Sequence, residues 1–240
     1  MSKPFLLAAP LALFGAFAAV AGDPPAAAPP PAAAPVDAAV AAPDPVPAAG
    51  PRSFVIDAKK SSIVIQVFKD GAAAALAHDH VVEARSFAGT IVADPAEVTT
   101  AKVEVTAQTA SFINDDPKVR TKFGLDGEIS DKDRKSVEEN MKDKDQLDVK
   151  SFPTVKFVST SVTKGADGKA TLAGKLTLHG VTKDVTMPLD AKVNGDTVTG
   201  NANFRVKTSD YGIKPYSALL GAVRNKDEIV LHLHLVAHAK

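Results

Sequence analysis

Apolar and polar residues alternate with a period of two along most of the chain from Ser53 onward, and this pattern restricts the fold more than any other feature. The clearest runs are residues 101–107, 185–193, 198–206 and 229–235. Because successive side chains of a strand point to opposite faces, such runs predict strands with one apolar and one solvated face. Turn residues at Asp167-Gly168 and Asn194-Gly195-Asp196 predict hairpins. We therefore predict an all-β, antiparallel fold of about eight strands closed into a barrel, because closure removes the exposed sheet edges.

One long connection interrupts the predicted strands. Residues 115–149 are polar, highly charged and poor in β-branched residues. Ser130 followed by Asp133 resembles a capping box, and Val137 and Met141 lie four residues apart, as neighbours on one helix face do. The pattern predicts one helix at about 131–145, packed by a narrow apolar stripe over one end of the barrel.

The first 52 residues lack the alternation. Lys3 gives a positively charged start, the segment from Phe5 to Val20 is apolar, and Ala19-Val20-Ala21 supplies the small residues of a cleavage site. We expect residues 1–21 to be a signal peptide that is cleaved before Gly22, since the segment is short for an uncleaved membrane anchor. Residues 22–52 are rich in Pro and Ala and are expected to form a disordered linker. The folded domain is then expected over 53–240, in the periplasm or secreted.

Composition excludes several classes of function. Lys plus Arg and Asp plus Glu number 28 each, so no net field would draw the protein to nucleic acid, and we expect no nucleic-acid partner. The chain has no Cys, which excludes thiol catalysis and thiolate metal ligands; we likewise expect no acyl anchor. No phosphate-binding loop or nucleophile elbow is present, and we expect a binding protein with no catalytic residue and no cofactor.

Two histidines one residue apart, His78 and His80, are the most distinctive polar pair. In a regular strand they would share a face with Leu76, Val82 and Ala84. Two imidazoles on one face can hold half of a Zn, Cu or Fe site, or can be polar groups in the wall of an apolar cavity.

Three histidines near the C-terminus decide between these two interpretations. His232, His234 and His238 alternate with leucines, so they are expected to point outward if the leucines point inward. No third metal ligand is then available, and we expect no metal. His78 and His80 are instead expected to hydrogen-bond the head group of a ligand at the mouth or wall of the cavity.

Three segments resemble the motifs of the YceI-like proteins. They are GKLTLHGVTKDVTMPL at 174–189, NMKDKDQLDVKSFPTVKFVST at 140–160 and SDYGIKP at 209–215. The resemblance spans about 53–240 and implies an exported, lipocalin-like barrel that holds a long apolar chain such as a polyisoprenoid or a fatty amide. At 70–90 the chain differs from the family pattern, since it is Ala-rich and carries His-Asp-His where members often have one His.

A second resemblance supplies the alternative function. The run from Gly71 through His78, His80 and Glu83 to Gly89 is loosely similar to the first motif of the cupins, although each spacing is off by one. The alternative is therefore a metal-dependent β-barrel enzyme that uses His78 and His80. The second cupin motif is not found in the sequence.

The resemblance implies that the ligand is a long-chain apolar small molecule, and a barrel of about eight strands has room for one slender ligand. A homodimer is compatible with the sequence, but nothing in it requires one. The residues expected to contact the ligand are His78, His80, Leu76, Val103, Val105, Phe157, Leu176, Leu178, Val185, Met187, Phe204, Leu231 and Leu233.

Export gives the first testable prediction. Protein recovered from the cell envelope or the medium should begin near Gly22, because the charged start, the apolar segment and the small cleavage-site residues occur together. N-terminal sequencing of the untagged protein measures this directly. An intact Met1 on the envelope fraction would contradict the prediction.

Overall fold

The computed structural model describes residues 50–125, 127–165 and 169–240. The predicted signal peptide, most of the predicted linker and the Asp167-Gly168 turn lie outside the described residues. The strands are β1 (Arg52–Ile56), β2 (Ser62–Asp70), β3 (His80–Ala84), β4 (Phe87–Asp94), β5 (Glu97–Gln108), β6 (Phe112–Asn114), β7 (Thr154–Lys164), β8 (Ala170–Leu178), β9 (Val181–Asn194), β10 (Thr197–Lys207), β11 (Ser217–Ala218) and β12 (Val223–Ala239).

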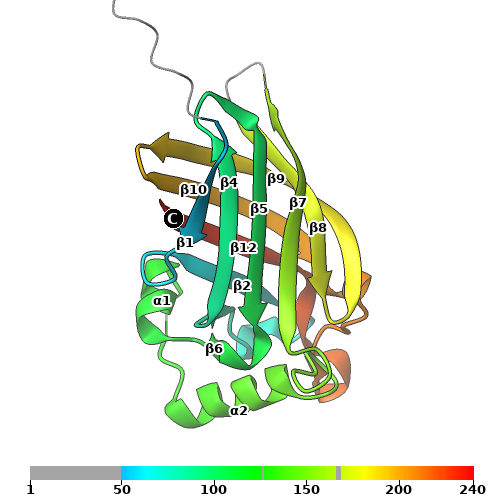
Figure 1. Ribbon diagram of the computed structural model, residues 1–240. Helices are drawn as coiled ribbons and strands as arrows, with labels where there is room; N and C mark the ends of the chain where they lie inside the picture. The colour runs from blue at the N-terminus through cyan, green and yellow to red at the C-terminus, as the bar shows by residue number, and fades with distance from the viewer. Residues whose placement is uncertain (1–49, 126, 166–168) are drawn as a thin grey trace, which may run out of the picture. The chain divides into compact units, whose positions relative to one another are not determined.

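Eight of these strands form a closed antiparallel barrel (Figure 1). The hydrogen-bonded order is β1-β4-β5-β7-β8-β9-β10-β12, and β1 pairs with β12 to close the ring. The alternating runs lie where they were predicted, in β5, β9, β10 and β12, and Asn194 and Thr197 face each other across the expected hairpin. The prediction of an antiparallel barrel of about eight strands is confirmed.

Three further strands, β2, β3 and β6, prolong the barrel at one end. β12 pairs with β1 at residues 237–239 and with β2 at residues 224–234, both antiparallel, so β2 continues the line of β1. In the same way β3 continues into β4 and β5 into β6, because β2 pairs with β3 and β3 with β6. We call each such pair of consecutive strands a line. The three lines are broken between their two strands, at residues 57–61, 85–86 and 109–111.

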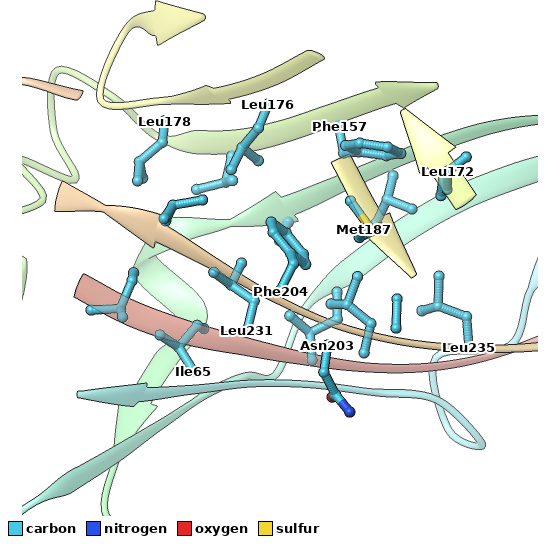
Figure 2. Close-up of a pocket in the computed structure, with 18 of the residues that line it drawn as sticks. Ile65, Phe157, Leu172, Leu176, Leu178, Met187, Asn203, Phe204, Leu231 and Leu235 are labelled. Carbon is cyan, nitrogen blue, oxygen red and sulfur yellow. The ribbon is translucent and has the colours of Figure 1, made fainter. Parts of the chain in front are cut away.

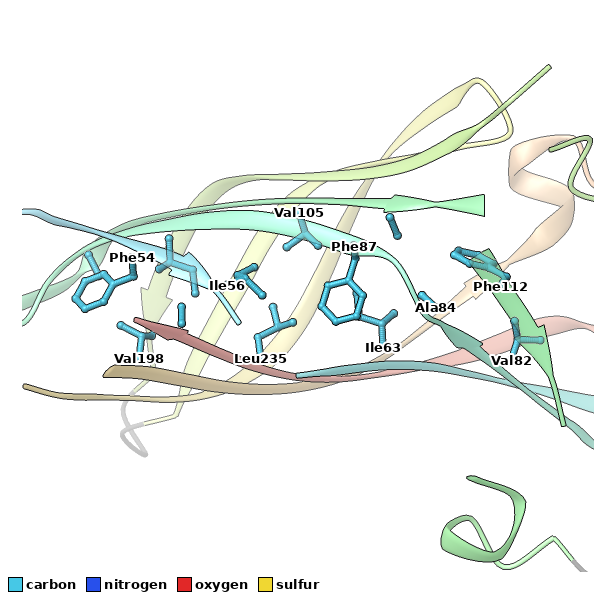
Figure 3. Packing of buried hydrophobic residues seen from close by; sticks show 14 residues of the cluster. Phe54, Ile56, Ile63, Val82, Ala84, Phe87, Val105, Phe112, Val198 and Leu235 are labelled. Atoms are coloured by element: carbon cyan, nitrogen blue, oxygen red, sulfur yellow. The ribbon is translucent and has the colours of Figure 1, made fainter. Parts of the chain in front are cut away.

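Each break changes which residues of the strand face inward. Buried core residues on the two sides of the breaks are separated by an odd number of positions: Ile56 and Ile63, Ala84 and Phe87, Ala107 and Phe112. An unbroken strand would put the two members of each pair on opposite faces. The breaks therefore keep both halves of each line facing one apolar core, which Figure 3 shows from close by.

Serine hydroxyl groups satisfy the backbone at two of the breaks. The Ser61 hydroxyl accepts a hydrogen bond from the Val236 amide at 2.9 Å and donates to the Val236 carbonyl at 3.3 Å. The Ser111 hydroxyl accepts from the Ser86 amide at 2.9 Å and donates to the Gln108 carbonyl at 2.7 Å. Backbone groups that lose their strand partners thus keep hydrogen bonds, which lowers the cost of interrupting the ladder.

The connection between β6 and β7 carries two helices, α1 (Pro117–Lys122) and α2 (Asp131–Lys142). The Ser130 hydroxyl caps α2 by accepting from the Asp133 amide at 3.1 Å, as predicted, and the helix ends three residues before the expected limit. Val137 and Met141 of α2 line the barrel interior, so α2 covers this end of the barrel, which we call the helix end. None of the helices within the described ranges is long and apolar enough to cross a bilayer.

The short helix α1 was not predicted. Its cap is Asp116, whose carboxylate accepts from the Lys118 amide at 2.9 Å and from the Val119 amide at 3.3 Å, and Pro117 occupies the first turn. Asp followed by Pro is a helix-start signal. The signal is present in the sequence, but the helix is too short to show an apolar period.

Close packing of strands produces the second testable prediction. A Cβ added to Gly89 in β4 would lie 2.2 Å from the carbonyl oxygen of Glu104 in β5, and that backbone atom cannot move without breaking the ladder. Gly89→Ala should therefore lower the free energy of unfolding by about 1–3 kcal/mol, measured by urea denaturation. Gly200→Ala is the matched control, since the nearest atom to its added Cβ is 3.7 Å away, and its stability should be unchanged or raised. Equal losses in the two variants would contradict the steric argument.

Candidate functional site

The barrel encloses a cavity of about 1150 Å³. Ten of the thirteen residues predicted to contact a ligand line it: His80, Val103, Val105, Phe157, Leu176, Leu178, Met187, Phe204, Leu231 and Leu233. Figure 2 shows Phe204, Met187 and Leu231 directed into a common space, whereas the side chain of Asn203 points away from it. The inward faces of β5, β8, β10 and β12 thus follow the period-two pattern of the sequence.

Leu76 and His78 do not line the cavity, and their predicted position in its wall is corrected. The expected strand through residues 76–84 begins only at His80, because residues 74–76 form a 3-10 turn. Leu76 is 76% exposed, and His78 is also exposed. The turn follows Gly71, which has φ of 98° and lies so close to the chain near Ala222 that an added Cβ would be 2.4 Å from the Ala222 carbonyl oxygen.

Val185 also lies outside the lining, although it packs against the core. Its cross-strand neighbour is Gly174, and a Cβ added to Gly174 would lie 2.4 Å from the Phe157 ring. The phenyl ring therefore fills the space over Gly174. Phe157, rather than Val185, meets the cavity at this level.

Part of the cavity wall was not predicted from the sequence. Ile63, Ile65 and Val67 of β2 line the cavity, as do Val82 of β3 and Met141 of α2. The alternation of apolar and polar residues at 62–68 could have predicted that these β2 residues face inward. Met141 could be assigned to a helix stripe, but its position over the cavity depends on the tertiary structure.

The charged residues that border the cavity have exposed side chains. They are Lys164, Lys169, Asp190 and Lys226. A buried ion pair, Asp115 with Arg120, lies beside His80 without itself lining the cavity. The surface that an enclosed ligand would meet is therefore mostly apolar, and His80 and Asn114 supply polar atoms to it at the helix end.

Asp115 is the centre of the network beside His80. One carboxylate oxygen, Oδ1, accepts from Arg120 Nη1 at 2.9 Å and from the Val81 amide at 3.1 Å. The other, Oδ2, is 2.6 Å from His80 Nδ1 and accepts from the side-chain nitrogen Nδ2 of Asn114 at 3.1 Å. Asp115 is fully buried, and its φ of 52° lies in the left-handed region, so the surrounding bonds hold an uncommon backbone conformation.

The network keeps the Asp115 carboxyl ionised. Burial would by itself raise the pKa of Asp115, but the hydrogen bond and charge of His80, the Val81 amide and the Arg120 guanidinium together hold its pKa below the usual value. Arg120 also donates to the carbonyl of Asp79 at 2.9 Å, which ties α1 to the start of β3. No local pattern in the sequence links residues 80, 115 and 120, so sequence reasoning could not find the network.

His232, His234 and His238 lie on the outer side of the barrel wall, as predicted. His232 Nε2 is 2.7 Å from Gln66 Oε1, and His232 Nδ1 is 2.9 Å from Asn203 Oδ1. His234 Nδ1 is 2.8 Å from Asn201 Oδ1. Burial beside the Phe123 ring lowers the pKa of His232. In the part of the chain that the structure describes, no group of three or more His, Cys, Asp or Glu side chains is arranged to hold a metal ion.

The buried pair leads to a stability prediction. Asp115→Ala should lower the free energy of unfolding by about 3–5 kcal/mol, because it leaves the Arg120 guanidinium buried without its carboxylate. Asp184→Ala, which breaks the exposed pair of Asp184 with Lys175, should cost less than about 1 kcal/mol. Chemical denaturation at pH 7 compares the two variants, and similar losses would show that the Asp115 pair does not stabilise the fold.

The same carboxyl predicts a pH dependence. Since folding lowers the pKa of Asp115, the unfolded chain takes up its proton at a higher pH than the folded chain does. The contribution of Asp115 to stability should be complete above about pH 4, the ordinary range for Asp, and be lost as the pH falls through the folded-state pKa. Asp115→Ala should accordingly flatten the acid limb of the stability curve, while Asp184→Ala should leave its slope unchanged.

Comparison with known proteins agrees with this architecture. The profile of the YceI-like domain matches residues 54–237. A UPF0312 protein of Pseudomonas fluorescens is 33% identical over 132 residues, which is 52% of this chain and 59% of the relative. A UPF0312 protein of Pseudomonas putida is 43% identical over 76 residues, 29% of this chain and 40% of the relative. The matched segments thus span less than two thirds of these relatives.

Solved structures show the same fold. BcnA of Burkholderia cenocepacia superposes with a TM-score of 0.57 at 22% identity, over 75% of this chain and 98% of BcnA. The YCEI protein of Campylobacter jejuni gives a TM-score of 0.50 at 19% identity, over 66% of this chain and 84% of that chain. At such identities the likeness concerns the fold alone. Because the domain profile covers nearly the whole barrel, this chain belongs to the YceI-like family.

Proposed function

We propose that this protein is an exported carrier, periplasmic or secreted, that holds one long apolar ligand of the isoprenoid or fatty-acid/amide type inside its barrel. The observation that carries the proposal is the apolar lining of the cavity, with side chains such as Leu178, Phe204 and Leu231. The predicted signal peptide at residues 1–21 supports export.

The long chain of the ligand would supply most of the binding free energy. Each CH₂ group that leaves water for an apolar wall contributes about 0.8 kcal/mol, before the cost of immobilising the ligand. A cavity of about 1150 Å³ offers this gain over many such groups. A compact polar substrate would lose its hydration against the same wall without recovering it in hydrogen bonds.

The alternative of a metal-dependent, cupin-like enzyme receives no such support from the described residues. It requires His78 and His80 to face one ion. His78 is exposed and outside the cavity lining, and His80 Nδ1 is bound to Asp115.

A charge placed in the cavity tests the carrier proposal. Phe204→Asp should abolish retention of an apolar ligand, because it puts a carboxylate into the wall. Thr186→Asp is the matched control, since it adds the same carboxylate to an exposed residue of β9 outside the cavity lining. Native mass spectrometry of protein from a lipid-containing host should show an added apolar mass on the wild type and on Thr186→Asp, and none on Phe204→Asp. An empty wild-type barrel that also takes up no isoprenoid or fatty amide would overturn the proposal.

A further inference from the structure

Three leucines are the most exposed large apolar residues in the described part of the chain. Leu76, Leu219 and Leu220 are 76%, 66% and 109% exposed, and no other large apolar residue within the described ranges exceeds 41%. The value for Leu220 means that no neighbouring residue covers its side chain. Single exposed leucines are ordinary on a protein surface, whereas a cluster of them marks a surface that contacts something else.

The three leucines lie in two loops that touch each other. One loop, residues 71–79, joins β2 to β3, and the other, residues 219–222, is the tip of the hairpin between β11 and β12. The Ala73 amide donates to the Ala222 carbonyl at 2.8 Å, which ties one loop to the other. We call the three leucine side chains on these loops the apolar tips.

The hairpin that carries two of the apolar tips belongs to the cavity wall at its base. Tyr216 and Asn225 both line the cavity, and the Asn225 amide donates to the Tyr216 carbonyl at 2.9 Å. Just after α2, the side chain of Gln146 donates to the Lys214 carbonyl at 3.1 Å, so the hairpin stands at the helix end. The apolar tips are thus outside the cavity lining but next to it.

The two loops carry no charged side chain. Residues 71–78 and 216–223 contain no Asp, Glu, Lys or Arg, although such residues make up 23% of the chain. Lys214 and Lys226 precede and follow the hairpin stretch, and both are exposed. Apolar tips with ammonium groups behind them match the layers of a bilayer, in which acyl chains lie beneath anionic phosphate groups.

The backbone gives no reason for leucine at the hairpin tip. Leu219 and Leu220 have φ of 49° and 55°, in the left-handed region that Gly and Asn adopt at lower cost than Leu. A residue selected only for this turn would therefore not be leucine. The side chains themselves, held where no protein atom covers Leu220, are the feature that needs a partner.

We propose that the apolar tips dock the helix end of the barrel on a lipid bilayer by inserting between the head groups and the upper acyl chains. A stable protein partner would bury about 800 Å² and about 20–30 residues on each side, which two short protruding loops do not supply. A bilayer needs no complementary shape. Docking goes beyond the carrier proposal and does not require it; only a transfer of ligand between the bilayer and the cavity beside Tyr216 would rest on that proposal.

Insertion can be observed directly, because the chain contains no Trp and one introduced tryptophan is the only indole that fluoresces. Full-length exported protein carrying Leu220→Trp is mixed with vesicles of equal parts phosphatidylcholine and phosphatidylglycerol. Its emission should shift to the blue, and phosphatidylcholine brominated on its acyl chains should quench it. Val158→Trp is the matched control, since Val158 is exposed on β7 and outside the cavity lining; its emission should neither shift nor be quenched.

A second variant removes the apolar tips of the hairpin without harming the turn. The double variant Leu219→Asn, Leu220→Asn should bind the same vesicles about tenfold or more weakly than the wild type in a sedimentation assay. Its stability to urea should be unchanged or raised, because Asn tolerates the left-handed region. Val158→Thr, an apolar-to-polar change that a strand accepts, should bind vesicles as the wild type does.

The proposal is overturned if the wild type does not sediment with the vesicles, if the double variant binds them as well as the wild type, or if the two tryptophan variants are quenched equally. A dimer that depends on Leu219 and Leu220, without vesicle binding, would overturn it too and assign the tips to contact between two copies. Native mass spectrometry keeps the carrier function separate. The double variant should retain any apolar ligand, because its changed residues lie outside the cavity lining.

Discussion

The pairing of β12 with β10, β2 and β1 turns a sheet with free edges into a closed ring. One side of β12 bonds to β10 along residues 228–238, and the other side bonds first to β2 and then to β1. A free edge would expose unpaired amide and carbonyl groups, and these pairings give both sides of β12 hydrogen-bonded neighbours. Closure also holds opposite walls apart, so the inward apolar side chains line a space instead of interdigitating. The cavity is thus a consequence of strand pairing.

The Asp115 network gives the helix end its geometry. A single buried carboxylate connects β3, β6 and α1, through the Val81 amide, Asn114 and Arg120. A buried ion pair adds little net stability compared with apolar packing, but the loss of one partner is costly. Such a cluster is therefore suited to fixing a conformation. In this barrel it holds the ring of His80, a polar side chain of the cavity lining at this end.

The sequence predicted the parts of the fold that depend on local periodicity. Val103, Val105, Phe204 and Leu231 line the cavity because they lie in long, regular strands whose alternation continues without a break. The prediction failed at Leu76, where a turn replaces the expected strand and the alternation carries no structural meaning. Short Ala-rich stretches alternate by chance more easily than long strands do.

Other features of the structure could not be predicted from any local pattern in the sequence. Residues 80, 115 and 120 come together through tertiary contacts, and Asp115 in the sequence resembles any other Asp at the end of a strand. The breaks at 57–61, 85–86 and 109–111 were equally hidden, because each of them reverses the phase of the alternation. A reader of the sequence who extends one phase across a break assigns the next strand to the wrong face.

The reversal of phase also determines where the chain tolerates a change of length. Each break shifts the alternation of an otherwise regular line by one position. Arg85 and Ser86, for example, are two residues between the inward-facing Ala84 and Phe87, where a regular strand would have one. Deleting one residue there would leave both neighbours inward and only straighten the strand, whereas a deletion within a strand would turn every later side chain to the opposite face. Homologous barrels can therefore differ in curvature through single-residue insertions and deletions at the breaks, while the chemistry of the lining stays the same.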